Sequence, residues 1–365
     1  MISKINSKFF YLLQLAIGKQ RHETITLDNE EWSLIFELAV KQSLVGMILE
    51  GAQRLSEKEI SQKPPLPILY EWIGQNEQIR QQNYKIDKQC EQLSSWFKQN
   101  GFSNCIIKGQ GVARLYPKPD SRQPGDIDIW VDGNRDKVVK LMRSNFIGVK
   151  YVDYVNCHAA FFTDTEVEVH FRPTWFYNPF VNRKVQKWIH ENQSAQLEHF
   201  DEKKDFSYPT IEFNLVFSLI HIYRHVFQEG IGLRQLTDYY FILTHSTESE
   251  RKKALAVMKS FGIGKFVSAV MYVMRHVYGM DSRMLMCESN DKQGKMLLNE
   301  ILRGGNFGHY DDRIAYVDIQ QRWKRGWENF KRNMRFVKDY PSEVTWMPLW
   351  RAWHYFWRMS KGYLD

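Results

Sequence analysis

The sequence lacks the patterns of disulfide-rich, zinc-binding and membrane-spanning proteins. Its 365 residues include four cysteines, Cys90, Cys105, Cys157 and Cys287, none of which belongs to a C-x-x-C pair. A zinc knuckle or a dithiol redox motif cannot be built locally, and we expect buried, reduced cysteines. The longest apolar run near the N-terminus, residues 9–17, is too short to span a bilayer. No small-residue cleavage site follows it, so we expect no signal peptide, no membrane partner and a cytoplasmic protein.

Concentrated positive charge is also missing. Fifty Lys and Arg residues against 42 Asp and Glu residues give a formal charge of +8, spread along the chain. Nucleic-acid-binding proteins gather basic residues on one face or in a tail, so we do not expect a nucleic-acid partner. Hydrophobic residues at 43% and aromatic residues at 15% exclude disorder as the dominant state. The length suits about two domains, or one large domain with additional segments.

The spacing of apolar residues divides the chain into three regions. Residues 1–100 carry apolar residues at helical spacing on both sides of a Pro-rich break, which predicts an N-terminal helical region. Residues 181–365 return to helical spacing and predict a C-terminal helical region. We therefore predict an α+β fold, in which residues 101–180 form an α/β core with a small mixed sheet between the two helical regions. Short runs predict strands at 105–107, 127–131, 151–155 and 165–171, and helices at 112–116 and 135–145.

The most informative strand is 127–131, because acidic and apolar residues alternate there. Asp126, Asp128 and Trp130 would share one face, whereas the intervening apolar residues would point into the core. The two carboxylates would lie about 6.5–7 Å apart at Cα and repel each other unless a cation intervenes. Hard oxygen ligands favour Mg²⁺ or Mn²⁺. The alternative is a solvent-exposed strand face, or a turn capped by Asp after Gly125.

A second alternating strand supplies a third carboxylate. In residues 165–171, Glu166, Glu168 and His170 share one face. If this strand lies beside the first, three carboxylates meet, as a two-metal phosphoryl-transfer centre requires. By alternation alone, Glu166 and Glu168 both fit the third position.

A glycine-containing turn precedes the acidic strand. Lys108, Gly109, Gln110 and Gly111 follow an apolar strand and open a short helix. Glycines at such a turn let backbone N–H groups approach a phosphate, and a helix N-terminus favours an anion. The turn alone is weak evidence, but its combination with the acidic strand makes the pattern specific.

Together these motifs resemble the core of the polymerase-β-like nucleotidyltransferase superfamily. The glycine turn, the Arg before the acidic strand, Asp126-Ile127-Asp128 and Glu168-Val169-His170 carry the resemblance. The order K-G, L-Y-P, R, D-I-D and E-x-H is similar to that of a bacterial group of nucleotidyltransferase family proteins. Residues 215–238 and the Gly304–Gly308 turn also resemble that group, so the likeness covers most of the chain.

The resemblance implies an enzyme and its metal ligands. Asp126 and Asp128 would coordinate Mg²⁺ or Mn²⁺, and Glu168, at the E-x-H position, would be the third catalytic carboxylate. The implied reaction transfers a nucleoside monophosphate, expected to be AMP from ATP, to an acceptor hydroxyl and releases pyrophosphate. The acceptor is a small molecule, a sugar or a protein side chain, because each of these would require the same carboxylates.

The resemblance also implies how the triphosphate of the donor is bound. Gly109 and Gln110 would lie at the triphosphate turn, although the superfamily usually has Ser where this chain has Gln110. Lys108 and Arg122 would contact phosphate, because phosphate needs cations and Arg can engage it bidentately. The Gln110 departure favours an alternative, a catalytically silent nucleotide-binding or regulatory protein of the same fold.

Two further features have more than one interpretation. His221 and His225 stand four apart on one helical face, but the Glu of H-E-x-x-H is absent. Packed histidines bonded to neighbours such as Asp238 are therefore favoured over a zinc site. The basic C-terminal tail could bind nucleic acid by stacking and charge, or form amphipathic helices that pack their aromatic residues inward. Its tryptophans are Trp323, Trp327, Trp346, Trp350, Trp353 and Trp357.

Overall fold

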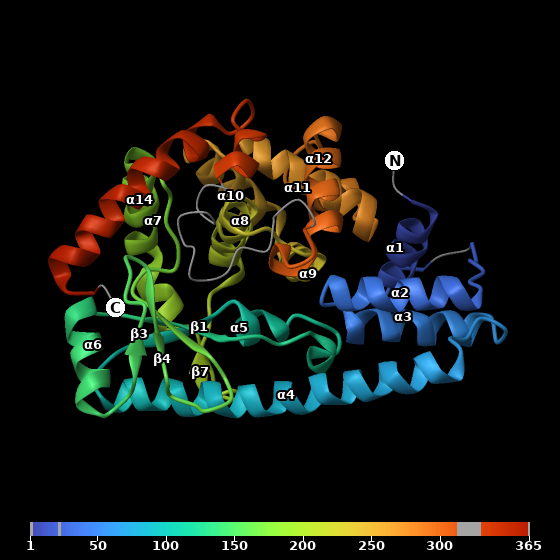
Figure 1. Cartoon of the computed structure of the whole chain (residues 1–365), viewed down its shortest axis with the longest axis horizontal. Helices are drawn as coiled ribbons and strands as arrows, with labels where there is room; N and C mark the ends of the chain where they lie inside the picture. The colour runs from blue at the N-terminus through green and yellow to red at the C-terminus, as the bar shows by residue number, and fades with distance from the viewer. Residues whose placement is uncertain (1–2, 21–22, 312–329, 364–365) are drawn as a thin grey trace.

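A computed structural model describes residues 3–20, 23–311 and 330–363 of the chain. Trp323 and Trp327 lie outside the described residues. The fold is α+β, as predicted: a small mixed sheet is surrounded by helices from both ends of the chain (Figure 1). Among the described residues no helix combines the length and apolar character that crossing a bilayer requires. All four cysteines are free, and three of them are buried.

The N-terminal helices form one layer beside and below the sheet. α1 (Lys4–Ala16), α2 (Asn29–Lys41) and α3 (Val45–Lys58) pack on one another, and α4 (Leu66–Gln99) follows the Pro-rich break. α4 is 34 residues long and runs along the lower edge of the molecule in Figure 1. Proline is tolerated at its start because the first N–H groups of a helix have no intrahelical partner.

The five-stranded sheet has the order β1-β2-β5-β4-β3. Its central strands, β2 (Ile127–Val131) and β5 (Val167–His170), are parallel, and every other pair is antiparallel. β1 (Asn104–Ile107) forms one edge, and β4 (Asn156–Ala159) connects β5 to β3 (Val149–Lys150) at the other edge. Short helices join the strands: α5 (Gly109–Ala113), η1 (Pro119–Ser121) and α6 (Arg135–Ser144).

Two sequence-based boundaries in the core are corrected. The strand predicted at 151–155 is wrong, because this segment turns between β3 and β4. Tyr151 has a left-handed backbone with φ 51°, and the carboxylate of Asp153 accepts hydrogen bonds from the N–H groups of Val155 and Asn156. An Asp side chain that satisfies the backbone in this way favours a turn over a strand. The helix predicted at 112–116 lies three residues earlier, as α5.

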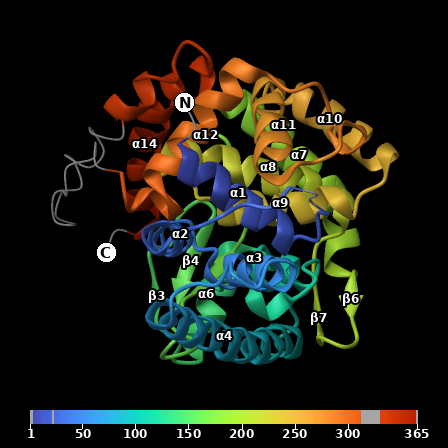
Figure 2. The ribbon, with the colours of Figure 1, turned by 90° about the vertical axis from the view of Figure 1, so that its right-hand side faces the viewer.

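Most of the C-terminal helices build the upper part of the molecule in Figure 1, with α8 at their centre. Their bounds are α7 (Pro179–Leu197), α8 (Ile211–Gln228), α9 (Leu233–Thr244), α10 (Glu248–Ser260), α11 (Gly264–Tyr278), α12 (Asp291–Gly304) and α14 (Pro341–Lys361). Two short 3₁₀ turns and a two-stranded sheet complete this part: η2 (Ser282–Met284), η3 (Asn306–Gly308), β6 (Phe200–Asp201) and β7 (Phe206–Ser207). In Figure 2, α1 lies in front of this layer and α2, α3 and α4 lie below it, with α14 on one side and β6 and β7 on the other.

The two faces of β2 pack into different cores. Ile127 and Ile129 share a hydrophobic cluster with residues of α4, whereas Trp130 belongs to the cluster that contains α8. The Trp130 ring stacks on Phe213 of α8 at 5.9 Å between centroids. Asp128 alternates with the isoleucines, so its side chain lies on the α8 side of the sheet. The aromatic residues of α14 partly pack inward, with Trp350 stacked on Trp175 at 3.9 Å.

Candidate active site

A cavity of about 330 Å³ lies where the sheet faces helices α8 and α9. Six of the seven site residues expected from the sequence line it: Lys108, Gly109, Arg122, Asp126, Asp128 and Glu168. Its other lining side chains include His221, His225, Arg234, Asp238, Phe307 and His309.

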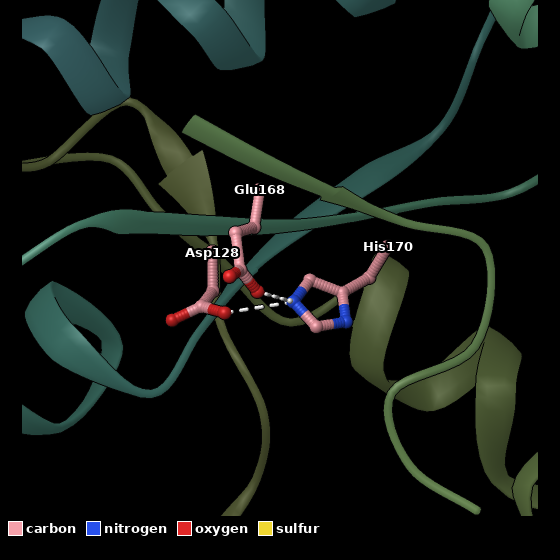
Figure 3. A group of neighbouring side chains, drawn as sticks. All are labelled: Asp128, Glu168 and His170. Carbon is pink, nitrogen blue, oxygen red and sulfur yellow. Dashed lines mark hydrogen bonds and ion pairs between the residues drawn. The ribbon is translucent and has the colours of Figure 1, made fainter. Parts of the chain in front are cut away.

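The parallel register of β2 and β5 brings two of the carboxylates together. Asp128 is the cross-strand partner of Glu168, and both side chains lie on the same face of the sheet. His170, two residues after Glu168, reaches back to both of them (Figure 3). Its Nε2 lies 2.7 Å from Asp128 Oδ1 and 3.3 Å from Glu168 Oε2. Asn156 of β4 donates a further hydrogen bond of 2.5 Å to Glu168.

Asp126 and Lys108 complete this acidic cluster. Asp126 precedes β2 and lines the same cavity. Lys108 lies between β1 and α5 with φ 55°, and its ammonium group contacts the Asp128 oxygen that also binds His170. Three carboxylates therefore share two cationic partners, the Lys108 ammonium and the His170 imidazole. Glu166, the other candidate for the third carboxylate, is exposed and pairs with His158.

Burial, neighbouring charges and hydrogen bonds shift the pKa values in the cluster. Burial and the charges of Asp128 and Glu168 raise the pKa of Asp126 to about 7. Burial also disfavours ionised Glu168, but the His170 hydrogen bond and the Lys108 charge outweigh it and hold the Glu168 pKa below its usual value. Burial of His170 is outweighed by its hydrogen bonds to the two carboxylates, so its pKa rises to about 9. At neutral pH, His170 is therefore an imidazolium.

The donor set suits a hard divalent cation. The atoms of Asp128, Glu168 and His170 that could bind a metal all lie within 4.8 Å of one another, and Asp126 adds a carboxylate to the same cavity. Carboxylate oxygens are the ligands of Mg²⁺ and Mn²⁺, and an imidazole is compatible with Mn²⁺ and other transition metals. The residues present therefore fit a divalent metal, which would take the place of the Lys108 ammonium beside Asp128.

Arg122 is held by a partner that the sequence did not suggest. Its Nε and Nη2 donate to the two oxygens of Asp238 at 2.7 and 2.8 Å, and the Tyr116 hydroxyl donates to the same carboxylate at 2.7 Å. Asp238 neutralises Arg122 and raises its pKa despite the burial. The pair fixes the segment 122–125 directly before Asp126.

Gln110 points away from the cavity. Its side-chain amide donates to Asp87 of α4 at 2.6 Å, and Lys204 also contacts Asp87. Gln110 therefore links α5 to α4, while Gly109 beside it lines the cavity.

His221 and His225 of α8 also line the cavity. Their rings lie 4.2 Å apart, and His225 Nδ1 lies 2.8 Å from Glu229. Asp238, which the sequence suggested as a partner, binds Arg122 and Tyr116 instead. Burial and the nearby Lys108 hold the pKa of His221 well below its usual value, so this ring is neutral at physiological pH. In the described parts of the chain, the one cluster with metal-binding geometry leaves both histidines out.

The sequence interpretation missed two contributions to the site. Alternation placed His170 on the face of Glu168, but nothing in the spacing showed that the imidazole would bridge both carboxylates. Phe307 and His309 reach the cavity from the turn at the end of α12, far from the motifs in sequence. No local pattern could have assigned them to the site.

Comparison with known proteins gives one result that bears on this cavity. The model of a family described as "Uncharacterised nucleotidyltransferase" matches residues 28–279, which is well over half of the chain. The matched segment includes the sheet, α8 and α9, and therefore the acidic cluster and the Arg122–Asp238 pair. No curated protein matches the chain.

Proposed function

The chain belongs to this nucleotidyltransferase family, and from that premise we propose that it transfers a nucleoside monophosphate from a nucleoside triphosphate to an acceptor hydroxyl. ATP is the donor in this proposal, and pyrophosphate is released. The observation that carries it is the pairing of Asp128 with Glu168 across β2 and β5, in a cavity that also contains Asp126 and Lys108. Phosphoryl transfer needs this concentration of carboxylates and cations, because its catalysis depends on positioning and charge neutralisation.

Asp126, Asp128 and Glu168 are the proposed ligands of Mg²⁺ or Mn²⁺. Such ions, when bound, neutralise charge on the phosphates and lower the pKa of an attacking hydroxyl. The contacts of Glu168 with Asn156 and His170 hold its carboxylate in one orientation. His170 keeps Asp128 and Glu168 at a fixed separation by donating to both.

Lys108 is the proposed phosphate-binding cation. It is half-buried at the cavity wall, and its ammonium can exchange Asp128 for a phosphate oxygen when a divalent cation takes over the carboxylate. Gly109 follows it and lines the same cavity, where the absence of a side chain leaves its backbone open to a phosphate. Arg122 is 4% exposed, and its guanidinium is bound to Asp238. We therefore assign it the role of positioning the 122–125 segment.

The acceptor site in this proposal is a second cavity of about 470 Å³. It shares Asp126, Glu166, Arg234 and Phe307 with the first cavity, so a hydroxyl bound there would lie beside the acidic cluster. Small molecules, sugars and protein side chains are all acceptors to be screened.

The test is calorimetric binding of each nucleoside triphosphate with and without Mg²⁺. The wild type is compared with Asp126→Asn/Asp128→Asn and with a control of equal charge change at two exposed carboxylates, Asp132→Asn/Asp205→Asn. We expect Mg²⁺-dependent binding of ATP to the wild type and the control, and none to the site variant. The proposal is wrong if ATP does not bind the wild type, or if the site variant binds it equally well.

Turnover separates the enzyme from the silent alternative. With α-labelled ATP and a panel of acceptors, the enzyme releases pyrophosphate and labels one of them. A protein that binds ATP with Mg²⁺ but never releases pyrophosphate is instead a nucleotide-binding or regulatory member of the family. A nucleic-acid-binding protein would show steep salt dependence and would not respond to the Asp126 and Asp128 substitutions.

A further inference from the structure

The walls of the first cavity differ in chemistry. The sheet side carries the acidic cluster and Lys108, whereas α8 and the η3 turn with its C-cap contribute four planar rings, His221, His225, Phe307 and His309. A nucleoside triphosphate has the same division, with a charged triphosphate at one end and an uncharged planar base at the other. The cavity therefore matches the donor in both of its parts.

Phe307 is held in a backbone conformation that bulky residues rarely adopt. Its φ of 52° and ψ of 25° lie in the left-handed region. The glycines at 305 and 308 allow the turn to pack closely against neighbouring backbone. A Cβ on Gly308 would lie 1.9 Å from the backbone O of Glu229, and one on Gly305 would lie 2.8 Å from that of Lys41. Strain that the surrounding packing maintains is typical of functional positions, and here it fixes one aromatic ring in the cavity wall.

The surroundings of the Phe307 ring suit a stacking surface. The ring lies 5.4 Å from His225, and the Arg234 guanidinium lies 5.5 Å from its centroid. The hydrogen bond of 3.1 Å from Gln235 to Asn306 anchors the preceding residue. Phe307 is only half-buried and lines both cavities, so the protein does not cover its ring completely.

We propose that Phe307 is the platform on which the nucleobase of the donor nucleotide stacks, which makes the α8–η3 wall the base subsite. This inference rests on the proposed function. It adds a specificity prediction, because a purine overlaps the ring over a larger area than a pyrimidine does. The platform favours ATP and GTP over CTP and UTP, and the acidic cluster binds the phosphates of all four.

The experiment compares a probe that has a base with one that lacks it. Binding of ATP and of inorganic tripolyphosphate, both with Mg²⁺, is measured for the wild type, Phe307→Ala and Phe307→Tyr. Loss of one base–aromatic stack costs about tenfold in affinity. We expect Phe307→Ala to weaken ATP about tenfold and to leave tripolyphosphate unchanged, and Phe307→Tyr to restore ATP binding.

Phe146→Ala is the matched control. Phe146 also has a left-handed backbone, with φ 60°, but its side chain is 99% exposed at the end of α6. We expect Phe146→Ala to bind ATP and tripolyphosphate as the wild type does. Thermal unfolding shows whether each variant is folded. If Phe307→Ala does not fold, Phe307→Leu replaces it, because Leu is a large apolar side chain without a π-face. We again expect weaker ATP binding and unchanged tripolyphosphate binding.

The outcomes separate this inference from the proposed function. If neither probe binds the wild type, the proposed function itself is wrong. If both bind and Phe307→Ala weakens them equally, Phe307 has a structural role and the platform is wrong. If Phe307→Ala leaves ATP affinity unchanged, the base lies elsewhere, and the platform is again wrong while the proposed function stands.

Discussion

Two carboxylates that line one cavity, Asp128 and Asp238, are neutralised in different ways. Asp238 accepts two hydrogen bonds from Arg122 and one from Tyr116. The charges of Arg122 and Asp238 therefore pair with each other in bidentate geometry. Asp128 shares Lys108 and His170 with other carboxylates, and burial together with the charges of Asp128 and Glu168 raises the pKa of its neighbour Asp126. The first arrangement is a closed ion pair, and the second has room for another cation.

The difference separates two uses of buried charge. A closed bidentate pair fixes geometry and has little to offer a ligand. A crowded acidic cluster is costly until a cation binds, and the same excess charge provides the affinity for that cation. The two arrangements lie side by side because Arg122 belongs to the segment that leads into Asp126 and β2.

The largest effect expected is that of breaking the closed pair. Arg122→Met leaves the Asp238 carboxylate buried without its cation, and we expect a loss of about 3–5 kcal/mol in the free energy of unfolding. Denaturant titration measures this loss. Arg122→Met/Asp238→Leu removes both charges and should recover most of the stability. A loss as large in the double variant as in the single one would show that packing, rather than the unpaired charge, is responsible.

Glu343 provides a third case for this comparison. It is a buried carboxyl at the start of α14, and it has no ion pair among the described residues. Burial raises its pKa to about 7, although the Arg224 charge opposes the shift. The folded protein therefore holds a proton that the unfolded chain releases above about pH 4.5, so stability falls as the pH rises toward 7. The effect is about 3 kcal/mol between pH 4.5 and pH 7.5.

Glu343→Gln removes this contribution. We expect the variant to lose less stability than the wild type between pH 5 and pH 8, as followed by denaturant titration at each pH. Glu248→Gln, an exposed carboxylate in the first turn of α10, is the matched control and should follow the wild-type curve. Parallel curves for the wild type and Glu343→Gln would contradict the prediction.

The local patterns of the sequence predicted the faces of the strands but not the partners of the side chains. Alternation along 127–131 and 165–171 placed Asp128, Glu168 and His170 on single faces, since period-two alternation is a local property of a strand. Their meeting depended on β2 and β5 being neighbours, which sequence spacing does not decide. The strand predicted at 151–155 failed because the Asp153 side chain competes with the sheet for backbone N–H groups.

Long-range contacts account for what could not be predicted. Arg122 and Asp238 are 116 residues apart, and Gln110 and Asp87 are 23 apart. Their pairing follows from the packing of α9 and α4 against the sheet. The contribution of Phe307 depends likewise on the packing of the η3 turn against α2 and α8, which no motif records.

Added metal tests the open cluster directly. A ligand that binds only the folded state at ten times its dissociation constant stabilises it by about 1.4 kcal/mol. We expect Mg²⁺ or Mn²⁺ at that level to raise the midpoint of thermal unfolding of the wild type and not that of Asp126→Asn/Asp128→Asn. Buffer without Mg²⁺ or Mn²⁺, brought to the same ionic strength with NaCl, controls for screening of charges. An equal rise in both proteins would place the bound metal outside this cluster.

The smallest effect concerns Gln110, the position at which the sequence departs from the superfamily that it resembles. Because its side chain bonds to Asp87 and lies outside the cavity, Gln110→Ser removes one hydrogen bond between α5 and α4, a loss of about 1 kcal/mol in unfolding free energy. We expect ATP affinity to change less than about threefold, a difference of roughly 0.6 kcal/mol. Calorimetry and denaturant titration on the same preparation measure both quantities, with Gln81→Ser on the exposed face of α4 as the control. A gain in ATP affinity of tenfold or more would show that position 110 reaches the triphosphate after all, and that the α5 turn moves when the donor binds.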